Sequence, residues 1–164
     1  MCSQLPAAAC AVDGLRVIAM TEKPSQIVLA LDTSTDMLAC AVGEVGPEGA
    51  RLLAAGDHLC RRQANVELVG TCQEVLGRAG LAMADVDALV VGRGPGSFTG
   101  VRIGVATAKG LSCGLSRPLY GVSALDATAW EAWAAGRRGL VAVALDAMRG
   151  EVYPGVYEIG RAHV

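Results

Sequence analysis

The chain has 164 residues, a formal net charge of −2 and a hydrophobic fraction of 52%. A chain of this size and apolar content can bury a hydrophobic core, which argues against global disorder. The slightly acidic balance argues against a chain that binds nucleic acid by itself, because such binding needs a basic surface.

Residues 1–26 differ in composition from the rest and are predicted to be a disordered N-terminal extension. Their apolar segment, 6–12, is short and has no basic residues before it, so it predicts neither a secretory signal nor a membrane span. Met20 is a possible alternative start of the natural chain. The folded lobe is predicted to cover residues 27–160, followed by a tail at 161–164.

Apolar runs and helical periodicity predict the secondary structure of the lobe in chain order. The predicted strands are Ile27–Leu31, Met37–Val45, Ala50–Cys60, Ala88–Val91, Leu119–Val122, Leu140–Leu145 and Glu151–Ile159, and the predicted helices are Asn65–Ala79, Val101–Gly114 and Ser123–Ala135. A three-stranded meander followed by strand–helix units predicts an α/β fold, a mixed sheet with helices on its faces. This is the order of ribonuclease H-like domains.

The first predicted helix has two different faces. Its larger apolar residues share one face, which is predicted to pack on the core: Leu68, Val69, Cys72, Val75, Leu76 and Ala79. A flatter face carries Val66, Gly70, Gln73 and Gly77. Two glycines on one helix face cost stability and therefore suggest the close approach of another helix.

A glycine loop follows the fourth predicted strand, and the chain reads as strand, loop and helix. The loop consists of Gly92, Arg93, Gly94, Pro95, Gly96, Ser97, Phe98, Thr99 and Gly100. Ser97 or Thr99 is predicted to cap the next helix, whose first amides could hold an anion, although a turn without a ligand explains the same pattern. The spacing matches neither a dinucleotide fingerprint nor a P-loop. Gly100, Gly104 and Ala108 form a ridge of small residues on that helix.

The cysteines and histidines indicate little chemistry. None of the six cysteines belongs to a C-x-x-C pair, which favours a reduced, cytoplasmic protein. The two histidines, His58 and His163, lie far apart and show no metal-ligand spacing with the cysteines. The sequence therefore predicts no metal site, and histidine-based catalysis is disfavoured.

Three motifs resemble the TsaB (YeaZ) family over about residues 27–160. They are Asp32-Thr33-Ser34-Thr35, the glycine loop continued to Gly104, and Asp146 followed by Gly150-Glu151-Val152-Tyr153. The resemblance implies the N-terminal lobe of an actin/hexokinase-like protein. It also implies a non-catalytic subunit that joins TsaD and TsaE in making threonylcarbamoyladenosine beside the tRNA anticodon. Such a subunit meets tRNA only through the complex and requires no cofactor, although ATP or ADP can lie at the complex interface.

The resemblance also suggests site residues. A weak phosphate-type site would use Asp32, Thr33, Ser34, Thr35 and Asp146, unless the two aspartates only bond the amides of their own turns. The expected partner interface, to TsaD or to a second copy, comprises Val66, Gly70, Gln73, Gly77, Gly100, Gly104 and Ala108.

The chain departs from the family pattern in three places. Ala64 stands where many relatives have a histidine, and Met148 stands where the arginine of a typical Asp-Ala-Arg motif is expected. Family members are longer, so the second lobe is expected to be truncated after about residue 160. Two alternative functions remain: a nucleotide-hydrolysing or phosphoryl-transfer enzyme of the same superfamily, and a peptidase. The missing histidines argue against a metal peptidase.

Overall fold

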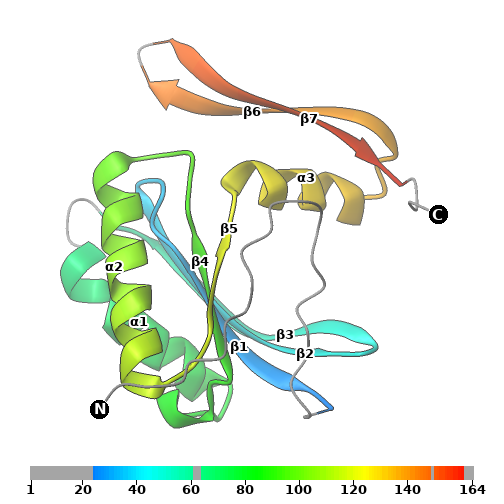
Figure 1. Cartoon of the computed structure of the whole chain (residues 1–164). Coiled ribbons are helices and arrows are strands. Elements are labelled where there is room, and N and C mark those ends of the chain that lie inside the picture. Colours follow the sequence, from blue (N-terminus) through cyan, green and yellow to red (C-terminus); the bar gives the residue numbers. More distant parts are fainter. Residues whose placement is uncertain (1–23, 61–63, 149, 161–164) are drawn as a thin grey trace, which may run out of the picture.

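The computed structural model describes residues 24–60, 64–148 and 150–160 (Figure 1). Its strands are β1 (Gln26–Asp32), β2 (Met37–Gly46), β3 (Gly49–Leu59), β4 (Ala88–Gly92), β5 (Leu119–Val122), β6 (Gly139–Met148) and β7 (Glu151–Ile159). Its helices are α1 (Ala64–Arg78), α2 (Phe98–Leu115) and α3 (Ala124–Ala134), with a short 3₁₀ helix at Met83–Asp85. The predicted order of strands and helices is confirmed.

Five strands form one mixed sheet in the order β3-β2-β1-β4-β5. Strands β1, β2 and β3 pair antiparallel as a meander, whereas β4 and β5 run parallel to β1. Parallel neighbours need a crossover, and α2 supplies it between β4 and β5. The predicted ribonuclease H-like arrangement is confirmed.

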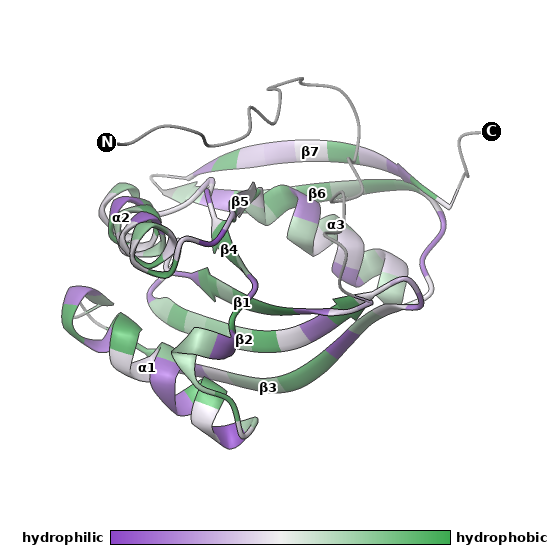
Figure 2. Ribbon diagram, turned by 60° about the horizontal axis from the view of Figure 1, so that its bottom comes forward, coloured by the Kyte–Doolittle hydropathy of each residue, from purple (hydrophilic) through white to green (hydrophobic). Residues whose placement is uncertain are grey.

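The hydrophobic core lies between this sheet and the helix pair α1 and α2, which pack side by side (Figure 1). Alternation along the strands points Leu29, Leu31, Leu38, Cys40 and Val42 into the core. Leu68, Cys72, Val75 and Leu76 of α1 complete it from the helix side. The apolar residues of β1, β2 and β4 form the mostly green centre of the molecule in Figure 2.

The last two strands do not join this sheet. Strands β6 and β7 form a separate antiparallel hairpin, with Val143 opposite Gly155. The hairpin packs on α3, and Tyr157 Oη of β7 donates a 2.8 Å hydrogen bond to Asp126 Oδ1. Figure 1 shows the hairpin apart from the sheet, with α3 between them.

Some predicted boundaries shift by a few residues. Helix α2 begins at Phe98 rather than Val101, and β6 extends to Met148 rather than ending at Leu145. Gln26, placed in the predicted extension, belongs to β1, and the Ser25 hydroxyl donates to Glu44. The rest of the predicted extension, the tail at 161–164 and Arg149 lie outside the described residues. No helix within the described ranges is long and apolar enough to cross a membrane.

Candidate functional site

The turn after β1 binds its own polar groups. Asp32 Oδ1 accepts hydrogen bonds from the Ser34 amide and the Ser34 hydroxyl, both at 2.6 Å. Thr33 and Ser34 are buried, while Thr35 is exposed and accepts from the Met37 amide at 3.1 Å. For Asp32, the geometry matches the alternative in which the carboxylate bonds the amide of its own turn.

The glycine loop packs directly on this turn. The Ser97 amide donates to the Ser34 carbonyl at 2.6 Å, and the Thr33 hydroxyl donates to the Gly100 carbonyl at 2.8 Å. A Cβ at Gly92 would overlap the Asp32 carboxylate, and one at Gly100 would overlap the Thr33 carbonyl. The glycines are therefore required because the loop backbone lies against the Asp32 side chain and the Thr33 backbone, with no room for a further side chain between them.

The same loop begins α2. Gly94 has a φ of +76°, in the left-handed region that favours glycine, and Pro95 follows it. Ser97 is the N-cap and accepts from the Gly100 amide at 3.3 Å, as predicted. Thr99 lies inside the helix, and Phe98 is exposed, with the Arg102 guanidinium 5.3 Å from its ring centre. The Ser97 and Gly100 amides are both used within the chain, which leaves fewer donors for an anion.

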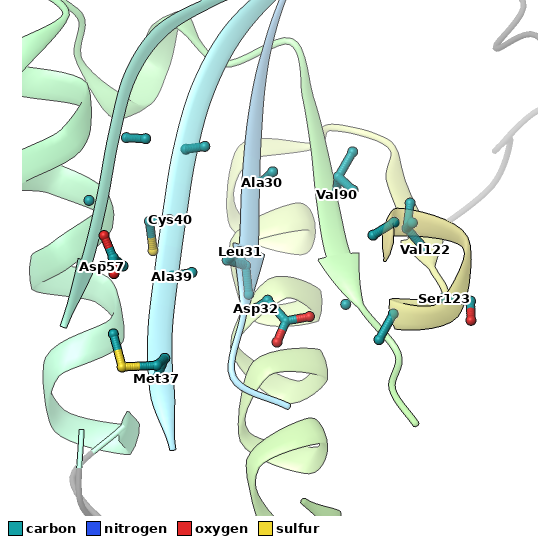
Figure 3. A pocket seen from close by; sticks show the side chains of 16 residues that line it. Ala30, Leu31, Asp32, Met37, Ala39, Cys40, Asp57, Val90, Val122 and Ser123 are labelled. Atoms are coloured by element: carbon teal, nitrogen blue, oxygen red, sulfur yellow. The ribbon is translucent and has the colours of Figure 1, made fainter. Parts of the chain in front are cut away.

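A cavity of about 490 Å³ opens beside Asp32, on the sheet face opposite α1 and α2 (Figure 3). Its polar groups come from Asp32, Asp57 and Ser123. Small apolar side chains line most of the rest: Ala30, Ala39, Ala41, Ala55, Val90, Val122, Ala124 and Ala127. A pocket of this kind accepts an apolar group more readily than a charged phosphate, because it offers few hydrogen-bond donors.

Asp146 does not line this cavity. It lies in the exposed part of β6, opposite Val152 of β7, in the hairpin that is separate from the main sheet. The structure therefore does not bring Asp146 and Asp32 together around one cavity, because the strand that carries Asp146 pairs only with its hairpin partner. Binding of a phosphate at Asp32 to Thr35 stays a prediction.

The flat face of α1 is exposed as predicted. Val66, Gly70, Gln73 and Gly77 all face solvent, and a Cβ at Gly70 or Gly77 would meet no atom within 4 Å. Leu76 is buried in the core. Val69, predicted to face the core, is instead 39% exposed, because it lies at the edge between the two faces.

The predicted ridge on α2 faces the opposite way from the expectation. Gly104 and Ala108 are buried, and Cβ atoms at Gly100 and Gly104 would overlap Thr33. These small residues allow α2 to lie close to the turn after β1. The prediction that they form part of an exposed partner interface was therefore wrong. The exposed small residues of α2 are Ala106, Gly110 and Gly114.

The structure brings together three residues that the sequence analysis did not connect. His58 Nε2 lies 2.9 Å from Glu67 Oε2, and the Cys60 thiol donates to the same oxygen at 3.1 Å. These hydrogen bonds, first that of Cys60 and then that of His58, lower the pKa of Glu67. A signal was present in the sequence: His-x-Cys at a strand end, just before the first turn of a helix that carries Glu67.

A second thiol contact lies inside the core. Cys40 Sγ of β2 and Cys72 Sγ of α1 are 3.5 Å apart and buried. Their hydrogen bond and their burial raise the pKa of Cys40, while the same bond lowers that of Cys72. Both thiols are enclosed by apolar side chains, so they serve packing rather than reaction with a substrate.

Comparison with known proteins places these features in a family. The family model "TsaD: tRNA N6-adenosine threonylcarbamoyltransferase" matches residues 58–164. Escherichia coli TsaB, a tRNA threonylcarbamoyladenosine biosynthesis protein, is 39% identical over 80% of this chain and 54% of its own length. Bacillus subtilis TsaB is 35% identical over 80% of this chain and 55% of its own. The chain thus spans about half the length of the curated relatives it matches.

Solved structures agree with this result. YeaZ from Pseudomonas aeruginosa is 38% identical and superposes with a TM-score of 0.69 over 83% of this chain and 62% of its own. A second Pseudomonas aeruginosa structure, described as similar to peptidase YEAZ, is also 38% identical, with a TM-score of 0.72, over 83% of this chain and 61% of its own. The described strands and helices therefore have the fold of this family.

Proposed function

This chain belongs to the family of the matching TsaD model, and within that family we propose that it is a TsaB-type subunit, a partner of TsaD rather than TsaD itself, that acts without catalysis of its own. In this proposal it binds TsaD, and TsaE joins the complex that makes threonylcarbamoyladenosine in tRNA. The tRNA is met only through the complex, ATP or ADP binds at the complex interface if at all, and the compartment is the cytoplasm. Curated relatives named for threonylcarbamoyladenosine biosynthesis support the pathway.

The contact between the glycine loop and the turn after β1 is the observation that carries the non-catalytic assignment. Asp32 Oδ1, the Thr33 and Ser34 hydroxyls and the Ser97 amide are all used in hydrogen bonds within the chain. A phosphate or its metal ion would have to break these bonds and enter a space where the backbones touch. This cost argues against the alternative of a nucleotide-hydrolysing enzyme.

Catalysis by the loop hydroxyls also lacks a base. An activated Ser97 or Thr99 needs a proton acceptor within hydrogen-bond reach, and Ser97 Oγ instead accepts from the Gly100 amide. Helix α1 contains no histidine, so it cannot supply the His-x-x-x-His metal pair that a TsaD-type centre would use.

The exposed face of α1 is the surface we assign to the partner. Val66, Gly70, Gln73 and Gly77 run along its length, and the glycines let another backbone approach closely. A second copy of this chain could use the same face, in which case a homodimer competes with TsaD.

The test is a titration of the chain against TsaD, by calorimetry, with Gly70→Leu as the variant. A leucine at this open position keeps the fold and blocks the close approach of a partner helix, so we expect binding to weaken at least tenfold. Ala134→Leu adds similar bulk at an exposed position of α3 and is expected to bind as wild type does.

Equal binding by wild type and Gly70→Leu would remove α1 from the interface. The non-catalytic assignment has a separate test, an ATP hydrolysis assay of the pure chain. Turnover that is lost on Asp32→Ala would contradict it, whereas no turnover above buffer is expected.

A further inference from the structure

The cluster of His58, Cys60 and Glu67 lies where β3 ends and α1 begins. Its three donor atoms all lie within 4.8 Å of one another. Cys60 is 8% exposed, whereas the side chains of His58 and Glu67 are 42% and 35% exposed. The cluster is therefore anchored in the protein on one side and open to solvent on the other, which gives an ion a path to it.

The cluster is held in place by secondary structure. His58 and Cys60 sit two residues apart, so β3 and the residue after it carry both to the same side. The Cys60 amide donates to the Asp36 carbonyl at 2.9 Å, and Glu67 belongs to the first turn of α1. The turn that contains Asp36, strand β3 and the start of α1 thus determine where the three donors stand.

The donor types are those of a transition-metal site. Imidazole nitrogen, thiolate sulfur and carboxylate oxygen are the ligands that Zn²⁺ takes in proteins, and purely oxygen-binding ions such as Mg²⁺ do not favour sulfur. A Zn²⁺ ion bound to one thiolate and one carboxylate is electrically neutral, so the site stabilises the ion without leaving net charge against the core.

Two of the three distances between the donor atoms need only a small change to fit a Zn²⁺ ion. Bonds of about 2.0–2.3 Å around a tetrahedral Zn²⁺ place neighbouring ligand atoms about 3.4–3.6 Å apart. The observed 2.9 Å and 3.1 Å are those of hydrogen bonds, in which a proton joins the atoms that a metal would separate. Rotation of the partly exposed His58 and Glu67 side chains would widen these two separations by about half an ångström, and the third pair, His58 Nε2 and Cys60 Sγ, lies within 4.8 Å.

The proton balance is simple. The lowered pKa of Glu67 keeps the carboxylate ionised at neutral pH. The Cys60 thiol would release its proton to solvent and become a thiolate when the metal binds. The proton that joins His58 Nε2 to Glu67 in the metal-free chain must also leave Nε2, so the imidazole would bind as the tautomer with its proton on Nδ1, an exchange that passes through solvent. Metal binding therefore releases one proton for the thiol.

A catalytic cysteine is the rival interpretation, and the geometry disfavours it. The Cys60 thiol donates to Glu67 rather than to His58, so the imidazole is not placed to take the thiol proton. The carboxylate stands between them, and a negative neighbour opposes formation of a free thiolate. A cation that bridges all three groups removes that opposition.

We propose that His58 Nε2, Cys60 Sγ and Glu67 Oε2 form a binding site for a single Zn²⁺ ion that ties the end of β3 to the start of α1. The fourth tetrahedral position is open to water, because three protein ligands leave one coordination site vacant. None of the three ligands belongs to the glycine loop or to the four residues assigned to the TsaD-binding surface, although Glu67 adjoins Val66 on α1.

The experiment is a titration of the metal-free, reduced chain with Co²⁺, followed by competition with Zn²⁺. Co²⁺ bound to a thiolate in tetrahedral geometry gives a charge-transfer band in the near ultraviolet and intense visible bands. We expect one equivalent to produce them and Zn²⁺ to abolish them. Cys60→Ser should lose the charge-transfer band, and His58→Ala or Glu67→Gln should weaken binding by about 100-fold, at least the loss typical of outer-shell changes.

Matched controls change three of the other cysteines and the one other histidine. Cys113→Ser changes an exposed thiol on α2, and Cys2→Ser with Cys10→Ser and His163→Ala covers residues near the chain ends. All should bind as wild type does. Circular dichroism shows whether each variant is folded, and Glu67→Gln, a conservative change on a helix surface, keeps the test valid if Cys60→Ser unfolds.

The proposal is overturned if no charge-transfer band forms, or if it persists in Cys60→Ser. It is also overturned if folded Glu67→Gln binds as tightly as wild type. A metal-dependent rise in the melting temperature that disappears in Glu67→Gln would support it independently, since an ion that binds the folded state alone stabilises that state.

Discussion

The sheet with α1 and α2 and the hairpin with α3 differ in how completely they bury their apolar residues. In the first region, the large side chains Leu29, Leu38, Leu68 and Leu89 are fully buried. In the second, the buried apolar residues among those described are Ala129, Val143 and Ile159, while large side chains are exposed: Trp130, Trp133, Leu140, Val152 and Val156. The sheet with α1 and α2 is stabilised by its own buried core, whereas the hairpin with α3 leaves large apolar side chains exposed.

The difference teaches that apolar content alone does not locate the core. Strand β6 is as apolar as β1, but it pairs with β7 and rests on α3 instead of lying between two layers. We expect the first region to carry most of the stability, because buried apolar area is the main stabilising term.

The largest expected effect contrasts two positions of α1. Leu76→Asp places an unpaired charge in the core and should cost about 3–5 kcal/mol, a large part of a domain's stability of roughly 5–15 kcal/mol. Val69→Asp, at a position 39% exposed, should cost much less. Urea unfolding of both variants checks this, and equal losses would mean that the edge of α1 is as buried as its centre.

An identical change at two glycines comes next. Gly100→Ala creates a clash with the Thr33 carbonyl and should destabilise the chain by about 1–3 kcal/mol. Gly70→Ala meets open space and should stabilise it by about 1 kcal/mol through helix propensity. Thermal melts measure both, and a destabilising Gly70→Ala would show that this helix face is covered in solution.

The hairpin should respond differently from the core. Leu140→Thr combined with Val156→Thr keeps β-propensity and removes two exposed apolar side chains, so stability should change by no more than about 0.5 kcal/mol per site. Binding of a hydrophobic dye and self-association should both decrease. Unchanged dye binding would place the exposed apolar surface elsewhere.

The smallest effect concerns the pH dependence of Glu67. Its folded-state pKa is lowered, so the carboxylate stabilises the fold above its unfolded pKa of about 4.3 and loses that contribution as the pH falls through the folded value. The stability difference between wild type and Glu67→Gln should therefore be constant near neutral pH and shrink in acid. A difference independent of pH down to acid would mean that the carboxylate is not preferentially ionised in the fold.

Much of the fold could be predicted because its signals are local. Apolar runs identified every strand, and the periodicity of α1 separated Leu76 from Gly70. Ser97 or Thr99 was predicted as the N-cap of α2 from its position before a helix, and Ser97 is the cap. The glycine loop was recognisable because its spacing of small residues is unusual. The segment it packs on, the turn after β1, could not be recognised in this way.

The sequence by itself determined the order of the strands and helices, the family and the exposed face of α1, since each depends on neighbouring residues or on a distinctive motif. Only the tertiary structure decided three further points: that Gly100 and Gly104 pack on Thr33, that Asp146 belongs to a separate hairpin, and that His58, Cys60 and Glu67 share one site. The reason is that each requires knowing which distant backbone segment lies opposite, and residue periodicity describes a face without naming what covers it.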